Sequence, residues 1–283
     1  TAALVRRWFP TRLTTALGVA YAGLGGGVLL MAPLSQTLIE HFGWRTSYVY
    51  VAAIPLVFVP VVMLLPWSRI AGATSGPSAQ TSPAQPQWTL ARAARTLPFW
   101  GLFVAFFGTS CAIFMLLPQI VAYFVSVGFT PLHSASAFGT IGMLSITGMI
   151  GVAWAAEHYG RILVVSLSYA SSAIGIVFFW GLSAYPSGLL LIVGLIIFGV
   201  PNGCRAPIIS ELAARLFTGR GYAAVMGGLN AGMGLGAGVG SLTGAAIHDA
   251  VGGYDWLFPC ALLSLLIANS MFWFIGPLRR GRW

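Results

Sequence analysis

Charge is scarce in this sequence. Lysine is absent, the 14 basic residues are all arginine, and only 5 residues are acidic. Charged residues make up 7% of the chain, whereas a soluble domain carries roughly 25%. A soluble globular domain is therefore excluded, and so is a disordered chain, which needs low hydrophobicity and high charge. The three cysteines lie inside apolar runs, so we expect buried thiols rather than disulfides or metal ligands.

Motifs for enzyme chemistry are also missing from the sequence. It has no Gly-Lys-Ser/Thr phosphate loop, no cluster of metal ligands and no neighbouring pair of carboxylates. No acidic residue lies in the middle of an apolar run, so these runs hold no buried carboxylate relay for protons. We expect no catalytic residue, no cofactor and no metal. The net charge of +9 does not indicate nucleic acid, because the arginines lie between the apolar runs.

What the sequence does have is long apolar runs. A membrane-spanning helix needs about 20 apolar residues, and 58% of this chain is hydrophobic. Turn-like segments at 128–133 and 185–188 divide the two longest runs. The pattern predicts an all-α polytopic membrane protein with eight spans, at 13–39, 46–68, two within 96–156, two within 162–204, 221–248 and 256–278.

The distribution of arginine predicts the topology. With the segments between spans numbered alternately, one set holds every arginine except Arg45. Because positive residues stay on the cytoplasmic side, we expect the C-terminus and the polar segment 68–97 to be cytoplasmic, in the inner (plasma) membrane of a bacterium. Residues 72–86 have a linker composition, and Trp88 to Arg95 is typical of a short amphipathic helix at the membrane interface.

An internal repeat relates two glycine-rich spans. At an offset of 209 residues, small residues of the first span coincide with small residues of the seventh: Gly18, Ala22, Gly23, Gly25 and Gly27 fall on Gly227, Ala231, Gly232, Gly234 and Gly236. Glu40 likewise falls on Asp249. Both spans begin on the same side, so the copies are parallel, as in transporters built from repeats about an axis normal to the membrane.

These residues resemble the major facilitator superfamily. Arg12-x-x-x-Ala16-x-Gly18 followed by Gly43-Trp44-Arg45 looks like helices five and six of such a carrier. The segment from Ala153 through Glu157 to Gly160 and Arg161 is similar to the family signature Gly-x-x-x-Asp-x-x-Gly-Arg between helices eight and nine, with Ala and Glu replacing the first Gly and the Asp. Arg7-Trp8-Phe9-Pro10 and Gly128-Phe129-Thr130 resemble the monocarboxylate and oxalate/formate carriers.

The resemblance implies the last eight helices of a twelve-helix carrier, and the offset of the repeat implies that about 110 residues precede residue 1. Residues 1–67 would close the N-terminal bundle, 68–97 would be the linker, and 98–283 would form the C-terminal six-helix bundle. The implied function is secondary active transport of a small organic anion, a mono- or dicarboxylate, by alternating access, in a monomer embedded in the lipid bilayer. The alternatives are efflux of hydrophobic compounds and a membrane-embedded acyl transferase, which would need a catalytic pair near one interface.

Polar residues inside the spans are the candidates for a substrate cavity. Arg205 lies in a segment whose Pro and Gly residues favour local unwinding of the helix. It is expected either to face the cavity and bind an anion or to extend to the headgroups. Asn230 and its repeat partner Tyr21 either line the cavity or pair across helices. The remaining candidates are Asn202, Gln119 and Tyr123.

By the resemblance, a further set of residues would control gating: Glu157, Gly160, Arg161, Arg12 and Arg220. The signature carboxylate Glu157 would latch the cytoplasmic side by facing the start of the first span near Arg12; otherwise it is a solvated loop charge. Small residues also recur every four positions in the seventh span, at Gly228, Gly232, Gly236, Gly240 and Gly244. This spacing indicates close helix packing, either static or in a helix that slides as the two bundles rock.

Overall fold

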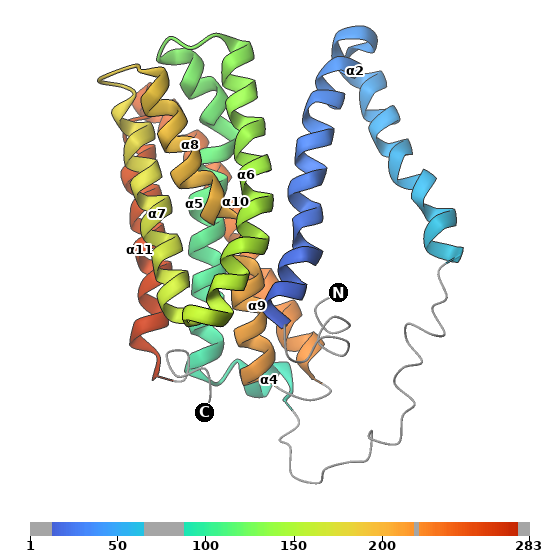
Figure 1. Ribbon diagram of the computed structural model, residues 1–283, viewed down its shortest axis with the longest axis vertical. Helices are drawn as coiled ribbons and strands as arrows, with labels where there is room; N and C mark the ends of the chain where they lie inside the picture. Colours follow the sequence, from blue (N-terminus) through green and yellow to red (C-terminus); the bar gives the residue numbers. More distant parts are fainter. Residues whose placement is uncertain (1–12, 65–87, 218–220, 277–283) are drawn as a thin grey trace. The chain divides into compact units, whose positions relative to one another are not determined.

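The computed structural model describes residues 13–64, 88–217 and 221–276, and these are helical with short connections (Figure 1). The helices are α2 (Leu13–Leu64), α4 (Leu90–Ala93), α5 (Leu97–Ser126), α6 (Pro131–Tyr159), α7 (Arg161–Gly181), α8 (Gly188–Asn202), α9 (Arg205–Leu216), α10 (Tyr222–Val251) and α11 (Leu257–Phe274). The prediction of an all-helical fold is confirmed for the described residues.

Two compact units make up the chain: residues 1–28 with 87–283, and residues 29–86. Helix α2 crosses the boundary between them and is not one regular helix. It bends at Gly43, whose φ of 73° and ψ of 160° are non-helical. The predicted spans 13–39 and 46–68 lie before and after this bend, although the structure describes the second only as far as Leu64.

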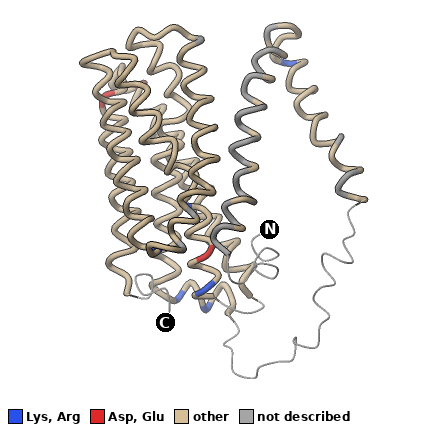
Figure 2. The backbone as a smooth tube through the Cα atoms, viewed as in Figure 1, with Lys and Arg blue, Asp and Glu red and all other residues tan. Residues whose placement is uncertain are grey.

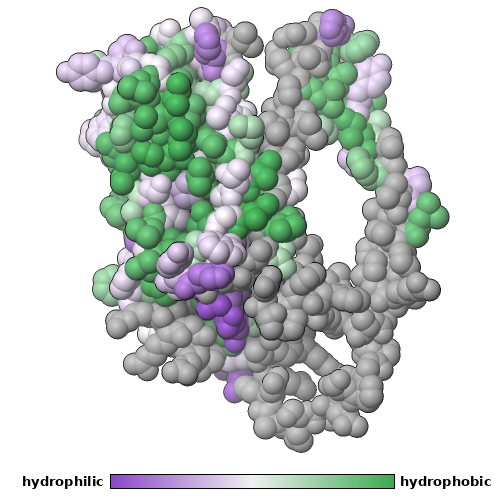
Figure 3. Space-filling model, viewed as in Figure 1, coloured by the Kyte–Doolittle hydropathy of each residue, from purple (hydrophilic) through white to green (hydrophobic). Residues whose placement is uncertain are grey.

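Six stretches of the described residues are long and apolar enough to cross a membrane: His41–Pro60, Leu97–Ser126, His133–Ala156, Arg161–Gly181, Gly188–Leu216 and Leu257–Phe274. The predicted spans 13–39 and 221–248 are helical too, within α2 and α10, but are not among the six. Helix α10 is rich in glycine, which lowers its mean hydropathy without shortening it. Figure 3 shows hydrophobic side chains over the middle of the helical surface and hydrophilic ones toward the ends.

The apolar stretch that holds the sixth predicted span is longer than the charge-free run, which ends at residue 204. The apolar stretch continues to Leu216, interrupted by a break between Asn202 and Arg205 that separates α8 from α9. The charge-free run stops at the first formal charge, Arg205. Here Arg205 and Glu211 are 1% and 0% exposed, so both charges lie inside the protein and do not mark the end of the span.

Helix α5 is the centre of the bundle formed by α5 to α11. It packs against α10 and α11, while α8 packs against α6 and α7, and α10 and α11 barely touch each other (Figure 1). The backbone of α10 approaches that of α5 because its glycines face it. A Cβ on Gly244 would lie 2.8 Å from the carbonyl oxygen of Met115, and a Cβ on Gly236 or Gly240 would overlap the carbonyl oxygen of Phe107 or Cys111.

Local sequence signals explain where several helices begin. The side chain of Thr130 accepts a hydrogen bond from the backbone of His133, and Pro131 opens α6. Helices α6 and α7 are separated only by Gly160, whose φ of 96° and ψ of 133° are disfavoured for residues with a Cβ. The chain therefore reverses from α6 into α7 at one glycine.

Serine side chains from neighbouring helices satisfy two carbonyl groups that prolines leave free. Pro201 has no N–H for the carbonyl of Ile197, four residues earlier, and the hydroxyl of Ser171 on α7 donates to that oxygen at 2.7 Å. Pro118 likewise leaves the carbonyl of Phe114 free, and Ser241 on α10 donates to it at 3.4 Å. Such side-chain donors make proline tolerable in a membrane helix.

Candidate functional site

Arg205, the first residue of α9, is the most deeply buried cation of the described chain. Its guanidinium extends to α7, where Nη2 donates to the carbonyl oxygen of Ser168 at 2.8 Å and to the hydroxyl of Ser172. Nε donates to the hydroxyl of Ser168 at 3.3 Å, and Cζ lies 4.4 Å from the ring centroid of Tyr169. Ser168 and Ser172 are roughly 10 and 16 Å along α7 from its first residue, at 1.5 Å per residue.

The partners of Arg205 form a polar chain across three helices. The hydroxyl of Thr109 on α5 donates to its own helix, at the carbonyl oxygen of Ala105. The hydroxyl of Tyr169 therefore donates to Thr109, at 2.6 Å. We call Arg205, Ser168, Ser172, Tyr169 and Thr109 the Arg205 cluster. It joins α9, α7 and α5 inside an otherwise apolar bundle.

No carboxylate balances the Arg205 cluster in the part of the chain that the structure describes. The partners of Arg205 are hydroxyl groups, a carbonyl group and an aromatic ring, all formally neutral. Nη1 is buried without a hydrogen-bond partner. Burying a guanidinium without an opposite charge costs free energy. The cluster is therefore suited to bind an anion, whose negative charge would balance the positive charge of Arg205.

Asn202 lies beside the cluster, at the end of α8. Its side-chain oxygen is buried and has no hydrogen-bond partner. Between Asn202 and Arg205, Gly203 lies so close to α6 that a Cβ there would be 2.6 Å from the side chain of Met149. Sequence reasoning expected local unwinding in this segment, and the break between α8 and α9 occurs there.

The other predicted cavity residues are not gathered around Arg205. Tyr123 is 3% exposed and donates its hydroxyl to the carbonyl oxygen of Phe179 at 2.7 Å, within an aromatic group that includes Phe258. Gln119 is half-buried on α5, and Asn230 is exposed on α10. The side chain of Tyr21 lies outside the described residues.

A second cluster of charged residues lies at one end of the bundle and forms an ion-pair network. Glu211 on α9 is fully buried, and its two oxygens accept from Nε of Arg161 on α7 and Nε of Arg215, each at 2.6 Å. Sequence reasoning placed Arg161 in the gating set but gave Glu211 no role. The spacing of Glu211 and Arg215, four residues apart in a helix, indicated one of the two pairs.

The same end of the bundle carries Arg92 and Arg95, next to the start of α5, and we call it the basic end (Figure 2). Gly160 lies there too, between α6 and α7. The remaining members of the predicted gating set cannot be placed. Arg12, Arg220 and the side chain of Glu157 lie outside the described residues, so the latch between Glu157 and Arg12 stays a prediction.

The five glycines predicted to pack face α5 and α4. Gly228 lies against Leu90 and Phe99, and Gly232 against the ring of Phe103, while Gly236, Gly240 and Gly244 lie against backbone carbonyls of α5. Gly234 and Gly238, on the opposite face, have open space where a Cβ would be. Among the described residues, one face of α10 is thus in close contact and the other is uncovered.

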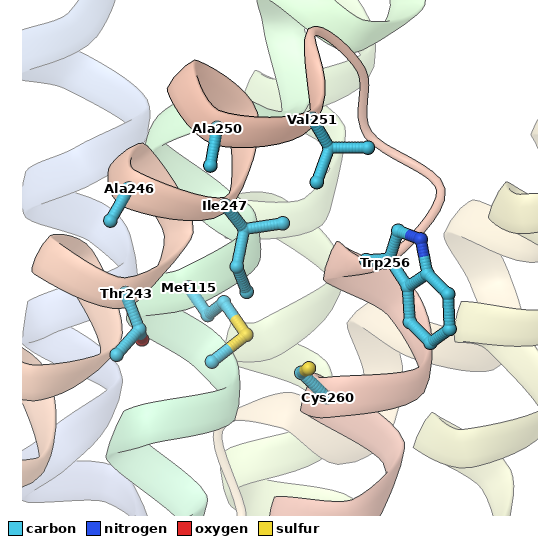
Figure 4. Close-up of a pocket in the computed structure, with 8 residues that line it drawn as sticks. All are labelled: Met115, Thr243, Ala246, Ile247, Ala250, Val251, Trp256 and Cys260. Atoms are coloured by element: carbon cyan, nitrogen blue, oxygen red, sulfur yellow. The ribbon is translucent and has the colours of Figure 1, made fainter.

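An apolar pocket lies between α5, α10 and α11, at the end of the bundle opposite the basic end. It has a volume of about 550 Å³. Figure 4 shows its lining: Met115, Thr243, Ala246, Ile247, Ala250, Val251, Trp256 and Cys260. Thr243 is the polar member, but its hydroxyl donates to Val239 in its own helix. The pocket is suited to hydrocarbon rather than to a charged group.

Comparison with known proteins relates this chain to a family of membrane transporters. Residues 1–202 match the family model described as Major Facilitator Superfamily. Monocarboxylate transporter 13 of Bos taurus is 24% identical over 275 residues, which cover 96% of this chain and 62% of that protein. Monocarboxylate transporter 13 of Rattus norvegicus is 25% identical, with 96% and 61% covered. A triacylglyceride transporter of Mycolicibacterium smegmatis is 30% identical over 152 residues, 53% of this chain and 26% of that protein.

The match to the family model covers more than half of the chain. It includes α2 and every helix from α4 to α8. The chain spans about 60% of the length of the two monocarboxylate transporters. The predictions of a member of a transporter family rather than of an enzyme family, and of an integral membrane protein with several spans, are confirmed. The chain belongs to the major facilitator superfamily of secondary transporters.

Proposed function

We propose that this chain is part of a transporter that carries a small organic anion, a mono- or dicarboxylate, by alternating access. The observation that carries the proposal is the Arg205 cluster: a guanidinium that is 1% exposed, lacks a carboxylate among the described residues and has an unpartnered Nη1. An anionic substrate would supply the missing negative charge. Ionisable residues inside membrane spans are expensive, and they mark substrate pathways.

The break between α8 and α9 supports the proposal. A buried guanidinium can bind substrate only if the surrounding helices move. Arg205 is the first residue after the break, so a change in backbone angles at Gly203 and Cys204 would move its side chain relative to α8. The start of α9 is also the positive end of a helix dipole, which favours negative charge nearby.

The relatives support the same substrate class, since two of them are named monocarboxylate transporters. We further propose that the basic end faces the cytoplasm of a bacterial cell, because arginine is retained on that side of the membrane. The linker, residues 68–97, and the C-terminus would then be cytoplasmic. The protein would act as a monomer in the plasma membrane.

The test is uptake by proteoliposomes that contain the full-length protein, with carboxylates and their uncharged amides as substrates. Arg205→Gln should lower carboxylate uptake at least tenfold and leave amide uptake within twofold. Arg205→Lys keeps the charge but not the forked donor, so its carboxylate uptake should lie between that of the parent and that of Arg205→Gln. The matched control is Arg45→Gln, an exposed arginine on α2. Equal losses for the carboxylate and the amide would reject the proposal.

The apolar pocket favours a second candidate function, export of a hydrophobic compound. Its lining is almost wholly hydrocarbon, and one relative is named a triacylglyceride transporter. Ala246→Phe would fill the pocket without adding charge. If the cargo is hydrophobic, this variant should lower export of a lipid probe while leaving carboxylate uptake unchanged, and Ala223→Phe, at an exposed position of the same helix, should lower neither.

A further inference from the structure

The junction of α4 and α5 presents a surface that neither transport candidate uses. Arg92 and Arg95 are exposed there, beside three exposed apolar side chains. Leu90 is 41% exposed, Leu97 is 75% exposed and Trp100 is 50% exposed. We call these five residues the α4–α5 edge. It combines positive charge with apolar surface at the end of a membrane-spanning helix.

Buried contacts of Trp88 and a hydrogen bond of Trp100 hold the α4–α5 edge in place. The ring of Trp88, which is 9% exposed, packs edge-on against Phe217 with centroids 5.1 Å apart. The carbonyl of Trp88 lies so close to Gly221 that a Cβ there would overlap it. The indole N–H of Trp100 donates to the carbonyl oxygen of Ala94 at 2.8 Å. Because these contacts fix α4 against α10 and α5, the exposed side chains project from an ordered support.

The positive charge of the edge is uncompensated within the described residues. At the same basic end, Arg161 and Arg215 share the carboxylate of Glu211. No ion pair there joins Arg92 or Arg95 to a carboxylate in the described ranges, and the guanidinium of Arg92 lies 5.4 Å from the ring centroid of Trp88. Among the side chains that the structure describes at this end, these four arginines face one glutamate, Glu211.

We propose that the α4–α5 edge binds the headgroup of an anionic glycerophospholipid. Arg92 and Arg95, three residues apart in and just after α4, would bind the phosphate, since guanidinium groups donate in the geometry that phosphate oxygens accept. Leu97 and Trp100, at the start of α5, would contact the upper acyl chain. Aromatic and basic side chains share this role at membrane interfaces. The bound lipid would secure α4 to α5.

The test compares phosphatidylglycerol with phosphatidylcholine of the same acyl chains, added to the full-length protein in detergent. Thermal unfolding should shift upward by several degrees more with phosphatidylglycerol. The double variant Arg92→Gln/Arg95→Gln should lose this difference and unfold within about a degree of the parent without lipid, while Arg92→Lys/Arg95→Lys should keep most of it. Arg45→Gln, exposed on α2, should keep all of it.

A second variant separates a lipid from a free phosphate. Leu97→Ser should weaken the response to phosphatidylglycerol, because it removes apolar contact, and glycerol phosphate alone should give no shift in any variant. The proposal fails if the two lipids stabilise the parent protein equally. It also fails if the double glutamine variant retains the difference, or if glycerol phosphate reproduces it.

Discussion

Nε of Arg161 donates to Oε2 of Glu211 at 2.6 Å, joining the first residue of α7 to α9 across 50 positions of sequence. The other oxygen of Glu211 accepts from Arg215 at the same distance. Glu211 is completely buried, whereas the side chains of Arg161 and Arg215 are 28% and 44% exposed. The carboxylate is thus the inner, shared member of the network, and it links α7 to α9 at the basic end.

Glu211→Gln should lower the free energy of unfolding by about 1–3 kcal/mol. The amide is nearly isosteric with the carboxylate, but it cannot accept two charge-assisted hydrogen bonds, each of which contributes about 1.5–3 kcal/mol. The two arginines can turn to solvent, which limits the loss. Thermal or denaturant unfolding of the full-length protein in detergent would measure it.

Replacing Arg161 and Arg215 should lower the free energy of unfolding by more than Glu211→Gln does. Arg161→Gln/Arg215→Gln removes both arginine partners of a buried carboxylate, and breaking a buried ion pair by removing one partner costs about 3–5 kcal/mol. The expected order is therefore parent, Glu211→Gln, then the double variant. The reverse order would show that burial of Glu211 does not depend on its arginines.

The glycines of α10 offer a matched comparison between two faces of one helix. Gly236→Ala and Gly240→Ala should each destabilise the protein by about 1–3 kcal/mol, because the new Cβ would meet a backbone carbonyl of α5 and force the helices apart. Gly234→Ala and Gly238→Ala have open space for the Cβ and should gain up to about 1 kcal/mol of helix propensity. The readout is the midpoint of unfolding in detergent.

Transport by the same four variants distinguishes packing from movement. If the uncovered face of α10 slides against another part of the transporter, Gly234→Ala and Gly238→Ala will lower the rate of transport while keeping stability. If these glycines have no such partner, the rate of transport will match that of the parent, and stability will be equal to or slightly above that of the parent. Destabilisation by Gly234→Ala or Gly238→Ala in detergent would contradict the packing seen here.

Sequence reasoning was effective wherever the physical cause is local. Apolar runs of about 20 residues located the helices, and the combination of Pro201, Gly203 and Pro207 indicated the break beside Arg205. The four-residue spacing of glycines in α10 indicated a helix face for close approach. Each of these inferences needed only the geometry of a single helix.

Sequence reasoning failed where the environment of a residue depends on a partner that is distant in the sequence. Two interpretations of Arg205 stayed open, a charge facing the cavity or a side chain extending to the headgroups, because nothing in the sequence reveals that Ser168 and Ser172, on α7, accept its N–H groups. Glu211 was given no role because its partner Arg161 is 50 residues away. Buried charges are tolerated only through such long-range contacts, so a rule that counts charges along the chain cannot detect them.

Gly160 should be intolerant of any side chain. Its φ of 96° and ψ of 133° lie outside the left-handed helical region that asparagine tolerates, so Gly160→Ala and Gly160→Asn should both destabilise by about 1–3 kcal/mol. Gly151→Ala, in the same α6 helix with open space at its Cβ, should be neutral or slightly stabilising. Unfolding in detergent measures all three, and rescue by asparagine would contradict the strain argument.

The hydrogen bond from Ser171 to Ile197 should depend on Pro201. Ser171→Ala should cost about 1 kcal/mol, because the carbonyl of Ile197 then has neither the hydroxyl nor a backbone N–H from residue 201. In a Pro201→Ala background the alanine N–H can donate to that carbonyl, so the same Ser171→Ala change should cost less. A double-mutant cycle on unfolding free energies therefore predicts a coupling of at least about 0.5 kcal/mol. Ser183→Ala, an exposed serine bonded within its own turn, is the control and should be nearly neutral in both backgrounds. Equal costs of Ser171→Ala with and without Pro201 would mean that the serine stabilises the contact between α7 and α8 for a reason other than the carbonyl that proline leaves free.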